Sequence, residues 1–464
     1  MPVTLFEKLW RSHVVRTFGD RALIHVDRHL VHEGTSRQAF DGLRARKRGV
    51  KNVDLTFGVI DHDPSTLPGR TALTYEPSRE RIGAMQENCR EFGIRLFDVN
   101  DPQQGIVHVI ATELGIVLPG MTVACGDSHT ATNGAVGAWC WGIGTTEIER
   151  VLATQTLMQG KPKTMRATFS GSMGPGVSAK DLILSLIGKY GVAVGTGYAI
   201  EYAGPAIRAL PMESRFTICN MSIEFGTRSG TIAPDDITFE YLYGRPFAPK
   251  GALWDRAVAH WRTLPSADDA EFDRELEVDC DQVKPQVTWG TSPQEVIGID
   301  EVIPQPGDLA PERRPVMAKS LAYMDLASGK PLDGLPIDFA FIGSCTNSRL
   351  SDLKAAAAVV QGRKVPPSVT AIVVPGSTQV KKAAEAAGLD RIFRDAGFQW
   401  RESGCSMCQT LGGDFVPPGK RCISTSNRNF EDRQGAKSRT HLASPAMVAA
   451  AAVSGCIVDV RRLI

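Results

Sequence analysis

The chain has 464 residues, of which 42% are hydrophobic and 22% charged, a composition typical of a globular protein with several domains. Its 52 basic and 51 acidic residues leave a net charge of +1, which excludes a general electrostatic attraction to nucleic acid or to a membrane. The sequence shows neither a signal peptide nor a run of about 18 apolar residues, so we expect a cytoplasmic protein that does not enter a membrane.

Apolar, strand-like runs alternate with helix-like stretches along the chain, which predicts α/β domains with mainly parallel sheets. Changes in composition predict three such domains, at residues 1–165, 166–295 and 296–464. The predicted strands are, in chain order, 53–60, 94–99, 121–126, 338–343, 370–376 and 420–426. The predicted helices include 78–93, 145–160, 179–191 and 378–389.

Four loops that follow or overlap the ends of predicted strands carry His, Asp, Asn, Ser or Cys side chains. They lie within residues 59–66, 124–134, 342–348 and 424–430. Ligands of parallel α/β sheets bind at the carboxyl ends of the strands. The sequence therefore predicts that a functional site is assembled from these loops.

Three of the ten cysteines stand out by their positions. Cys345 follows a predicted strand at a turn into a helix, where backbone N–H groups favour a thiolate, and Cys405 and Cys408 form a C-x-x-C pair. This pair alone is shared by zinc, redox and iron–sulfur sites. A closed zinc site needs four ligands, and Cys422 is expected in the core of its strand. Three thiolates on a four-iron cluster would leave one iron open as a Lewis acid.

Six motifs, occurring in the same order over essentially the whole chain, resemble those of the aconitase superfamily. They are DRHLVHEGTSRQAFDGL, GDSHTATNGAVGAWCWGIGTTEIE, CNMSIE, FIGSCTNS, GCSMC and STSNRNFEDRQG. The resemblance implies three α/β domains around a central iron–sulfur cleft. It also implies that the fourth, swivelling domain of aconitases is carried by a separate small subunit, in a heterodimer or heterotetramer.

The resemblance further implies one 4Fe–4S cluster per chain, held by Cys345, Cys405 and Cys408. Side chains expected beside the cluster or its substrate are those of Asn347, Asn427 and Arg428. Arg428 and Arg433 are expected to bind substrate carboxylates, because the planar guanidinium suits two-pronged contacts.

The family mechanism assigns proton transfer and water binding to a second set of residues. Asp61 and His62 resemble the dyad that gives a proton to the departing hydroxyl, a role that general acid catalysis requires. The groups expected to hold the iron-bound water are His108, Asp127 and His129, with Glu224 paired to one of these histidines. Asn220, one helical turn before Glu224, is expected to bind substrate. We place His29 and His441 outside the catalytic set and assign no role to His32.

The expected activity is that of a hydro-lyase that isomerises 2-isopropylmalate to 3-isopropylmalate in leucine biosynthesis, active only with the small subunit. The same chemistry on another 2-substituted malate is the alternative: citramalate, a dimethylmalate, homocitrate or a bulkier alkyl or aryl malate. An RNA-binding relative without a cluster is a remote alternative, which the balanced charge disfavours. A zinc-dependent thiol hydrolase is more remote still.

Overall fold

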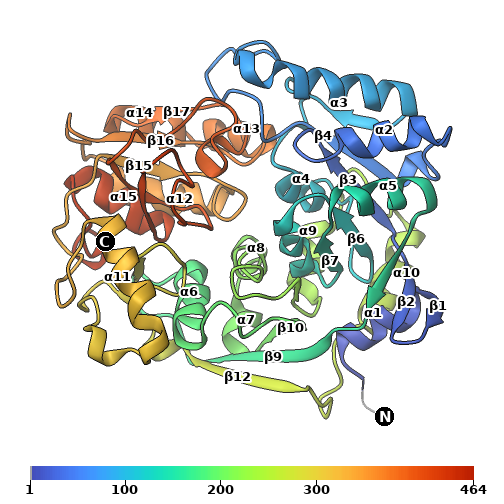
Figure 1. Cartoon of the computed structure of the whole chain (residues 1–464), viewed down its shortest axis with the longest axis horizontal. Helices are drawn as coiled ribbons and strands as arrows, with labels where there is room; N and C mark the ends of the chain where they lie inside the picture. The colour runs from blue at the N-terminus through green and yellow to red at the C-terminus, as the bar shows by residue number, and fades with distance from the viewer. Residues whose placement is uncertain (1–2) are drawn as a thin grey trace. The chain divides into compact units, whose positions relative to one another are not determined.

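The computed structural model describes residues 3–464, which form two compact units (Figure 1). Unit 1 comprises Met1–Asp63, Glu76–Gly171 and Ala193–Val278, and unit 2 comprises Pro64–Tyr75, Ser172–Val192 and Asp279–Ile464. Each unit is therefore assembled from separate stretches of the chain. The division of the sequence into three domains stays a prediction.

The first sheet of unit 1 is parallel throughout, with the strand order β5-β4-β3-β6-β7. Its central strands β3, β4 and β6 are almost entirely buried, as expected for a parallel sheet covered by helices. Helix α2 packs against both α3 and α5 beside this sheet (Figure 1). The elements are β3 (Arg28–His32), β4 (Thr56–Val59), β5 (Arg95–Phe97), β6 (Thr122–Cys125), β7 (Trp139–Gly142), α2 (Arg37–Ala45), α3 (Arg79–Phe92), α4 (Val107–Glu113) and α5 (Thr145–Thr154).

A second sheet of unit 1 has the order β11-β10-β9-β12, in which β10 is parallel to both β9 and β11. Helix α8 packs against the long 3-10 segment η3, which follows β6 in the first sheet. A small antiparallel sheet, β1-β2-β8, completes the sheets of this unit that the structure describes. The bounds are β9 (Lys163–Ser170), β10 (Tyr198–Ala203), β11 (Ser229–Thr231), β12 (Arg274–Asp279), β1 (Val14–Phe18), β2 (Arg21–His25), β8 (Thr156–Gly160), η3 (Ser128–Val136), α1 (Leu5–His13), α7 (Pro205–Ala209), α8 (Met212–Asn220), α9 (Asp236–Leu242) and α10 (Ala252–Trp261).

Unit 2 is built on a five-stranded parallel sheet of order β17-β16-β15-β18-β19. Helix α15 packs against both α12 and β15, and its four central alanines, 449–452, are fully buried in the core of the unit. Small side chains at these positions allow the elements to approach closely. The bounds are β15 (Phe339–Ile342), β16 (Thr370–Val373), β17 (Gln399–Trp400), β18 (Arg421–Ser424), β19 (Arg439–Leu442), α6 (Ala179–Tyr190), α11 (Arg314–Met324), α12 (Leu350–Val360), α13 (Thr378–Ala386), α14 (Leu389–Ala396), α15 (Pro445–Ser454) and the antiparallel pair β13 (Gln286–Thr288) and β14 (Val296–Gly298).

The predicted α/β class with mainly parallel sheets is confirmed, and each predicted strand contains an observed one. The helix predicted at 145–160 is wrong in its second half. The observed helix ends at Thr154, Gln155 adopts a left-handed conformation with φ of 58°, and residues 156–160 form β8. Antiparallel pairing of β8 with β2 is a long-range contact that a helical pattern in the sequence cannot show.

No helix within residues 3–464 has the length and apolar character needed to cross a membrane.

Candidate active site

The acid–base residues of unit 1 gather at one edge of its parallel sheet. Asp61 and His62 follow strand β4, and Asp127 and His129 follow strand β6. Both strands pair in parallel with β3, which lies between them, so their carboxyl ends meet at the same edge. His108 reaches the same group from α4. The sheet topology thus brings together residues that lie up to 68 positions apart in the chain.

His62 lies between two carboxylates. Its Nδ1 is 2.6 Å from Oδ1 of Asp61, and its Nε2 is 3.1 Å from Oδ2 of Asp127. An ionised carboxylate only accepts hydrogen bonds, so both ring nitrogens must carry protons when both carboxylates are ionised. This arrangement therefore favours an imidazolium, which is the form of histidine that can donate a proton.

The Asp61 carboxylate is fully buried and has a second contact. Its Oδ2 accepts a hydrogen bond of 2.8 Å from the backbone N–H of Val107, the first residue of α4. Burial alone would raise the pKa of Asp61, but the adjacent His62, together with His32 and the Val107 N–H, outweighs burial and holds this pKa below its usual range. Asp61 therefore stays charged and orients the imidazole.

Asp127 is a shared acceptor for several neighbours. Its Oδ1 lies 3.0 Å from Nε2 of His108 and accepts a hydrogen bond of 2.7 Å from the backbone N–H of His129, while Oδ2 faces His62. Burial would raise the pKa of Asp127, but His108 and the further hydrogen bonds lower it well below its usual range. One ionised carboxylate thus contacts three of the predicted residues.

The remaining predicted residues of unit 1 come from α8 and the segment after it. Nε2 of His129 lies 2.9 Å from Oε1 of Glu224, and both side chains are buried. The Asn220 side chain donates a hydrogen bond of 2.8 Å to the Thr132 hydroxyl. These contacts join α8 to η3, so the structure places Glu224 against one of the histidines and Asn220 beside the same segment.

Two residues in contact with this group were not predicted from the sequence. The His32 ring stacks on that of His62, with centroids 4.6 Å apart, and Glu33 accepts backbone hydrogen bonds from residues 61–63. Burial and the nearby His62 lower the pKa of His32. Their position at the carboxyl end of β3, the central strand, is the signal that could have identified them: His32 is its last residue and Glu33 follows it.

His32, Glu33, Asp61 and His62 each offer a ligand atom within 4.8 Å of the others, and they are the one such group found among residues 3–464. Their polar atoms are already engaged. Glu33 accepts the backbone N–H groups, Asp61 is bonded to His62, and the two nitrogens of His32 contact the Gly34 N–H and the Thr35 hydroxyl. The group is therefore a hydrogen-bond network, and a cation there would have to break it.

Cys345 in unit 2 lies on the turn that joins β15 to α12. The turn contains Ser344 in a left-handed conformation, with φ of 75°, and is tied to the end of β18 by a hydrogen bond of 2.8 Å from the Gly343 N–H to the Thr425 hydroxyl. The Asn427 side chain donates to the Cys345 sulfur over 3.4 Å. The Cys345 side chain is thus held in a turn with a polar donor beside it.

Cys405 and Cys408 lie on a tight turn, in which the Cys408 N–H donates to the Cys405 carbonyl over 3.0 Å. Arg433 donates from Nη2 to the Cys408 sulfur over 3.5 Å, and its guanidinium also lies over the Phe430 ring. All three predicted cysteine ligands are between 3% and 4% exposed. Donors aimed at two of the three sulfurs stabilise thiolates, the form that binds metal.

The polar residues predicted around the cluster have these places. The Asn347 side chain donates to Asp352 in the first turn of α12, over 3.0 Å, and Arg428 is half-buried in the loop after β18. Cys422 is fully buried inside β18, and burial raises the pKa of its thiol. His441, outside the predicted site, contacts the Arg421 side chain and the Thr288 carbonyl.

These residues fit a cluster with three thiolate ligands. The three cysteines do not form a group whose ligand atoms all lie within 4.8 Å among residues 3–464. A tetrahedral zinc site, with Zn–S bonds of about 2.3 Å, would need sulfurs roughly 3.8 Å apart. Cys422 lies within strand β18, and no disulfide is formed within the described chain. At least one sulfur–sulfur separation therefore exceeds what a single tetrahedral zinc ion allows, and three buried thiols with no fourth thiol beside them in the described chain suit a larger cluster.

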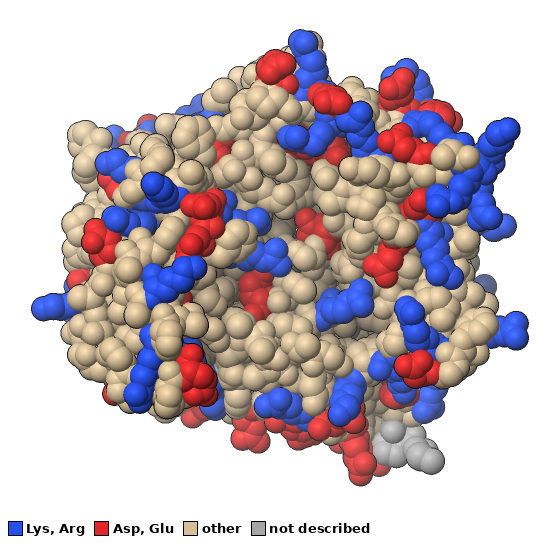
Figure 2. Space-filling view, viewed as in Figure 1, with Lys and Arg blue, Asp and Glu red and all other residues tan. Residues whose placement is uncertain are grey.

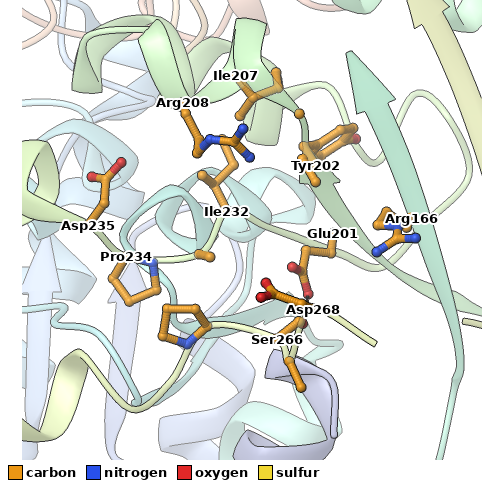
Figure 3. Close-up of a pocket in the computed structure, with 15 residues that line it drawn as sticks. Arg166, Glu201, Tyr202, Ile207, Arg208, Ile232, Pro234, Asp235, Ser266 and Asp268 are labelled. Carbon is orange, nitrogen blue, oxygen red and sulfur yellow. Dashed lines mark hydrogen bonds between the residues drawn. The ribbon is translucent and has the colours of Figure 1, made fainter. Parts of the chain in front are cut away.

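A cavity of about 320 Å³ in unit 1 is lined by none of the predicted site residues (Figure 3). Figure 3 shows Glu201 and Asp268 on one side and Arg208 across from them. The buried Glu201 accepts a hydrogen bond of 2.7 Å from Ser266, and Asp235 forms an ion pair with Arg215. Glu201 and Asp235, two of the charged residues that line this cavity, are therefore already bonded to other side chains of the protein.

Charged residues of both signs are interspersed on the face of the molecule shown in Figure 2. The distribution agrees with the net charge of +1 and adds nothing in favour of an RNA-binding protein.

Histidine–carboxylate pairs follow the strands of a parallel sheet in unit 1, and buried thiols follow strands of the parallel sheet in unit 2, a pattern typical of α/β enzymes. Residues 7–455 match the Aconitase family (aconitate hydratase), and the chain belongs to this family. It is 57% identical over 463 residues to 3-isopropylmalate dehydratase large subunit 1 of Bradyrhizobium diazoefficiens, a match covering 99% of this chain and 97% of that protein.

Among solved structures, the chain is similar to the holo-form of aconitase X from Thermococcus kodakaraensis. The TM-score is 0.48 at 12% sequence identity, and the match covers 92% of this chain and 89% of the other.

Proposed function

We propose that this chain is the large subunit of an iron–sulfur hydro-lyase that isomerises 2-isopropylmalate to 3-isopropylmalate in leucine biosynthesis. The observation that carries the reaction class is the His62 ring between two buried carboxylates, Asp61 and Asp127. The substrate rests on the 57% identity, over nearly the whole chain, to a protein named as the large subunit of 3-isopropylmalate dehydratase.

The reaction removes a proton from one carbon and a hydroxyl from its neighbour, and then returns water with the two positions exchanged. Hydroxide is a poor leaving group and departs more easily as water. We assign the required proton to Nε2 of His62, while Asp61 holds Nδ1 and keeps the ring oriented. His62 receives a proton back when water is added in the second half of the reaction.

The groups around Asp127 bind the water that leaves and returns. We assign this role to His108, Asp127 and His129, with Glu224 fixing the His129 ring through its contact of 2.9 Å. Asn220 supports the same segment through Thr132. These buried groups replace bulk water around the hydroxyl, which strengthens their interaction with it.

Substrate binding is assigned to residues of unit 2. Arg428 and Arg433 provide positive charge for the two carboxylates of a malate, which the balanced net charge of the chain does not supply. Cys345, Cys405 and Cys408 would hold a 4Fe–4S cluster, with Asn347 and Asn427 beside it. When bound, this cluster supplies an open iron as a Lewis acid.

The proposed enzyme also requires a partner chain. The relative's name designates a large subunit, which implies a small one. We propose that the small subunit of this enzyme supplies the base that takes the carbon-bound proton, in a heterodimer or a heterotetramer.

The test is anaerobic reconstitution of the chain with iron, sulfide and its cognate small subunit, followed by assay of a substrate panel. We expect the highest kcat/KM with 2-isopropylmalate, measured against citramalate, 2,3-dimethylmalate and homocitrate. A preference of about tenfold or more for another malate, which corresponds to about 1.4 kcal/mol, would assign the chain to that substrate instead. Absence of turnover with every member of the panel would contradict the proposed reaction class.

A further inference from the structure

Glu33 follows the central strand β3, and its carboxylate faces the backbone of the loop after β4. Its Oε1 accepts hydrogen bonds from three successive backbone N–H groups: 3.1 Å from Asp61, 2.7 Å from His62 and 2.8 Å from Asp63. Oε2 lies 3.3 Å from the Asp61 N–H as well. Glu33 is only 3% exposed, so little water competes with its carboxyl group for these N–H donors.

These bonds fix the loop on one side while other contacts fix it elsewhere. The Asp61 carboxylate is bonded to the start of α4, and Asp63 is paired with Arg81 on α3 at 2.8 Å. The ring of His32 stacks on His62 at an interplanar angle of 29°. Residues 61–63 are thus held by contacts with α3, with α4 and with the end of β3. Among these contacts, only those of Glu33 are made to the backbone of the loop itself.

A purely structural carboxylate would make similar bonds, and unit 2 contains one. Glu295 is 3% exposed, accepts the Thr291 N–H over 2.7 Å and contacts the Ser320 hydroxyl at 2.9 Å. None of these contacts reaches a predicted catalytic residue. Glu33 differs in that the N–H group at its shortest hydrogen bond belongs to His62 itself.

We propose that Glu33 is a positioning residue, which holds the loop 61–63 so that the His62 ring stays between Asp61 and Asp127. The inference rests on the acid role proposed for His62. A shift of the His62 backbone would move Nε2 away from Asp127 and from any substrate hydroxyl beside it. Catalytic groups displaced by as little as about 1 Å lose roughly 10²-fold in rate, so the contribution of Glu33 is expected in kcat.

The first test compares Glu33→Gln with the matched control Glu295→Gln, each purified with its cluster and with the small subunit. Glutamine keeps the size of the side chain but replaces one carboxyl oxygen by an NH2 group, which removes an acceptor. We expect Glu33→Gln to lower kcat about 10- to 100-fold with KM changed less than about threefold, because the loss arises in the transition state. Glu295→Gln should keep kcat within about twofold while lowering the unfolding temperature to a similar extent. Equal kcat values for the two variants would overturn the inference.

The second test is a double-mutant cycle with His62→Ala. If Glu33 acts through His62, adding Glu33→Gln to His62→Ala should slow the enzyme no further. A double variant that is slower by the product of the two single effects would show that Glu33 acts independently of His62. If His62→Ala itself keeps full kcat, the acid role in the proposed function fails, which is a different outcome from failure at Glu33.

Iron content and circular dichroism identify variants that do not fold. If Glu33→Gln does not fold, Glu33→Asp replaces it in the same cycle, since aspartate keeps the carboxyl group but is one methylene too short to reach all three N–H groups. We expect the kcat of Glu33→Asp to lie between those of the wild type and His62→Ala. A wild-type kcat for folded Glu33→Asp would contradict positioning by this carboxylate.

Discussion

His62 and Asp127 lie 65 positions apart in the sequence and meet with an Nε2–Oδ2 distance of 3.1 Å. Because Asp61 holds the other ring nitrogen at 2.6 Å, the Asp127 contact sets where the second proton of the ring points. The loops after two different strands therefore define the orientation of one imidazole.

Replacing His62 by alanine is expected to lower kcat by about 10²- to 10⁴-fold with a small change in KM. General acid catalysis contributes in this range and acts only in the transition state. The measurement is steady-state kinetics of the reconstituted complex. His13→Ala is the control, because His13 forms a similar pair with Asp27 at 2.7 Å but lies at the end of α1. Equal effects of the two substitutions would remove His62 from the mechanism.

Serine at Cys345, Cys405 or Cys408 is expected to abolish the cluster, because each thiolate is one of three protein ligands. Iron and acid-labile sulfide after anaerobic reconstitution give the cluster content, which should be about one per wild-type chain. Cys422→Ser should retain it, since this thiol is buried within β18. Loss of the cluster in Cys422→Ser would indicate a closed site with four ligands.

Arg433→Lys is expected to raise KM by about 10- to 100-fold, the equivalent of one lost charge-assisted hydrogen bond of about 1.5–3 kcal/mol. A lysine ammonium cannot reproduce the forked contact of a guanidinium. Arg461→Lys is the control, because Arg461 makes a forked contact with Asp459 near the chain's end. An unchanged KM with full iron content would exclude Arg433 from substrate binding.

Protonation of His441 is expected to destabilise unit 2 as the pH falls. Burial, with Arg421 nearby, lowers the pKa of His441 to about 3, whereas the unfolded chain titrates near 6.5. Between these values the unfolded state binds the extra proton, so the free energy of unfolding decreases by up to about 1.4 kcal/mol per pH unit as pH falls below 6.5.

Urea unfolding of the cluster-free chain at several pH values measures this slope. His441→Gln should flatten it by about one proton between pH 6.5 and about 4.5. A slope equal to that of the wild type would mean that His441 takes up a proton in the folded state.

The isolated chain with its cluster is expected to show no hydratase turnover, and activity should appear on adding the small subunit. The base that takes the carbon-bound proton must lie within about 2.6–3.2 Å of its donor atom, and we assign this base to the partner. Alkene absorbance with and without the small subunit is the measurement. Substantial turnover by the isolated chain would place the base among its own residues.

The sequence predicted the parts of the fold and site that depend on local pattern. Strands that end in polar loops were recognisable at Asp61, Asp127 and Cys345, because buried apolar runs precede them directly. The strand at 156–160 was missed, since only its pairing with β2 distinguishes it from the end of a helix. Glu33 was missed for a related reason, as its three donors lie 28 to 30 positions further along the chain.

The assembly of each unit from separate segments could not be predicted from the sequence either. Residues 172–192 join unit 2, where Lys180 donates to the carbonyls of Thr425 and Ser426 across some 245 positions. A lysine in the first turn of a helix carries no mark of such a partner in the sequence. Only the folded chain shows that it supports the loop that carries Asn427 and Arg428.

The alanines of α15 have a consequence for the chemistry of unit 2. Their methyl groups set how closely α15 approaches β15 and α12, the two elements joined by the Cys345 turn. A bulkier side chain among residues 449–452 would separate these elements and carry one sulfur away from its partners. If the three cysteines hold the proposed cluster, we expect such a variant to retain less iron, although α15 itself contributes no ligand.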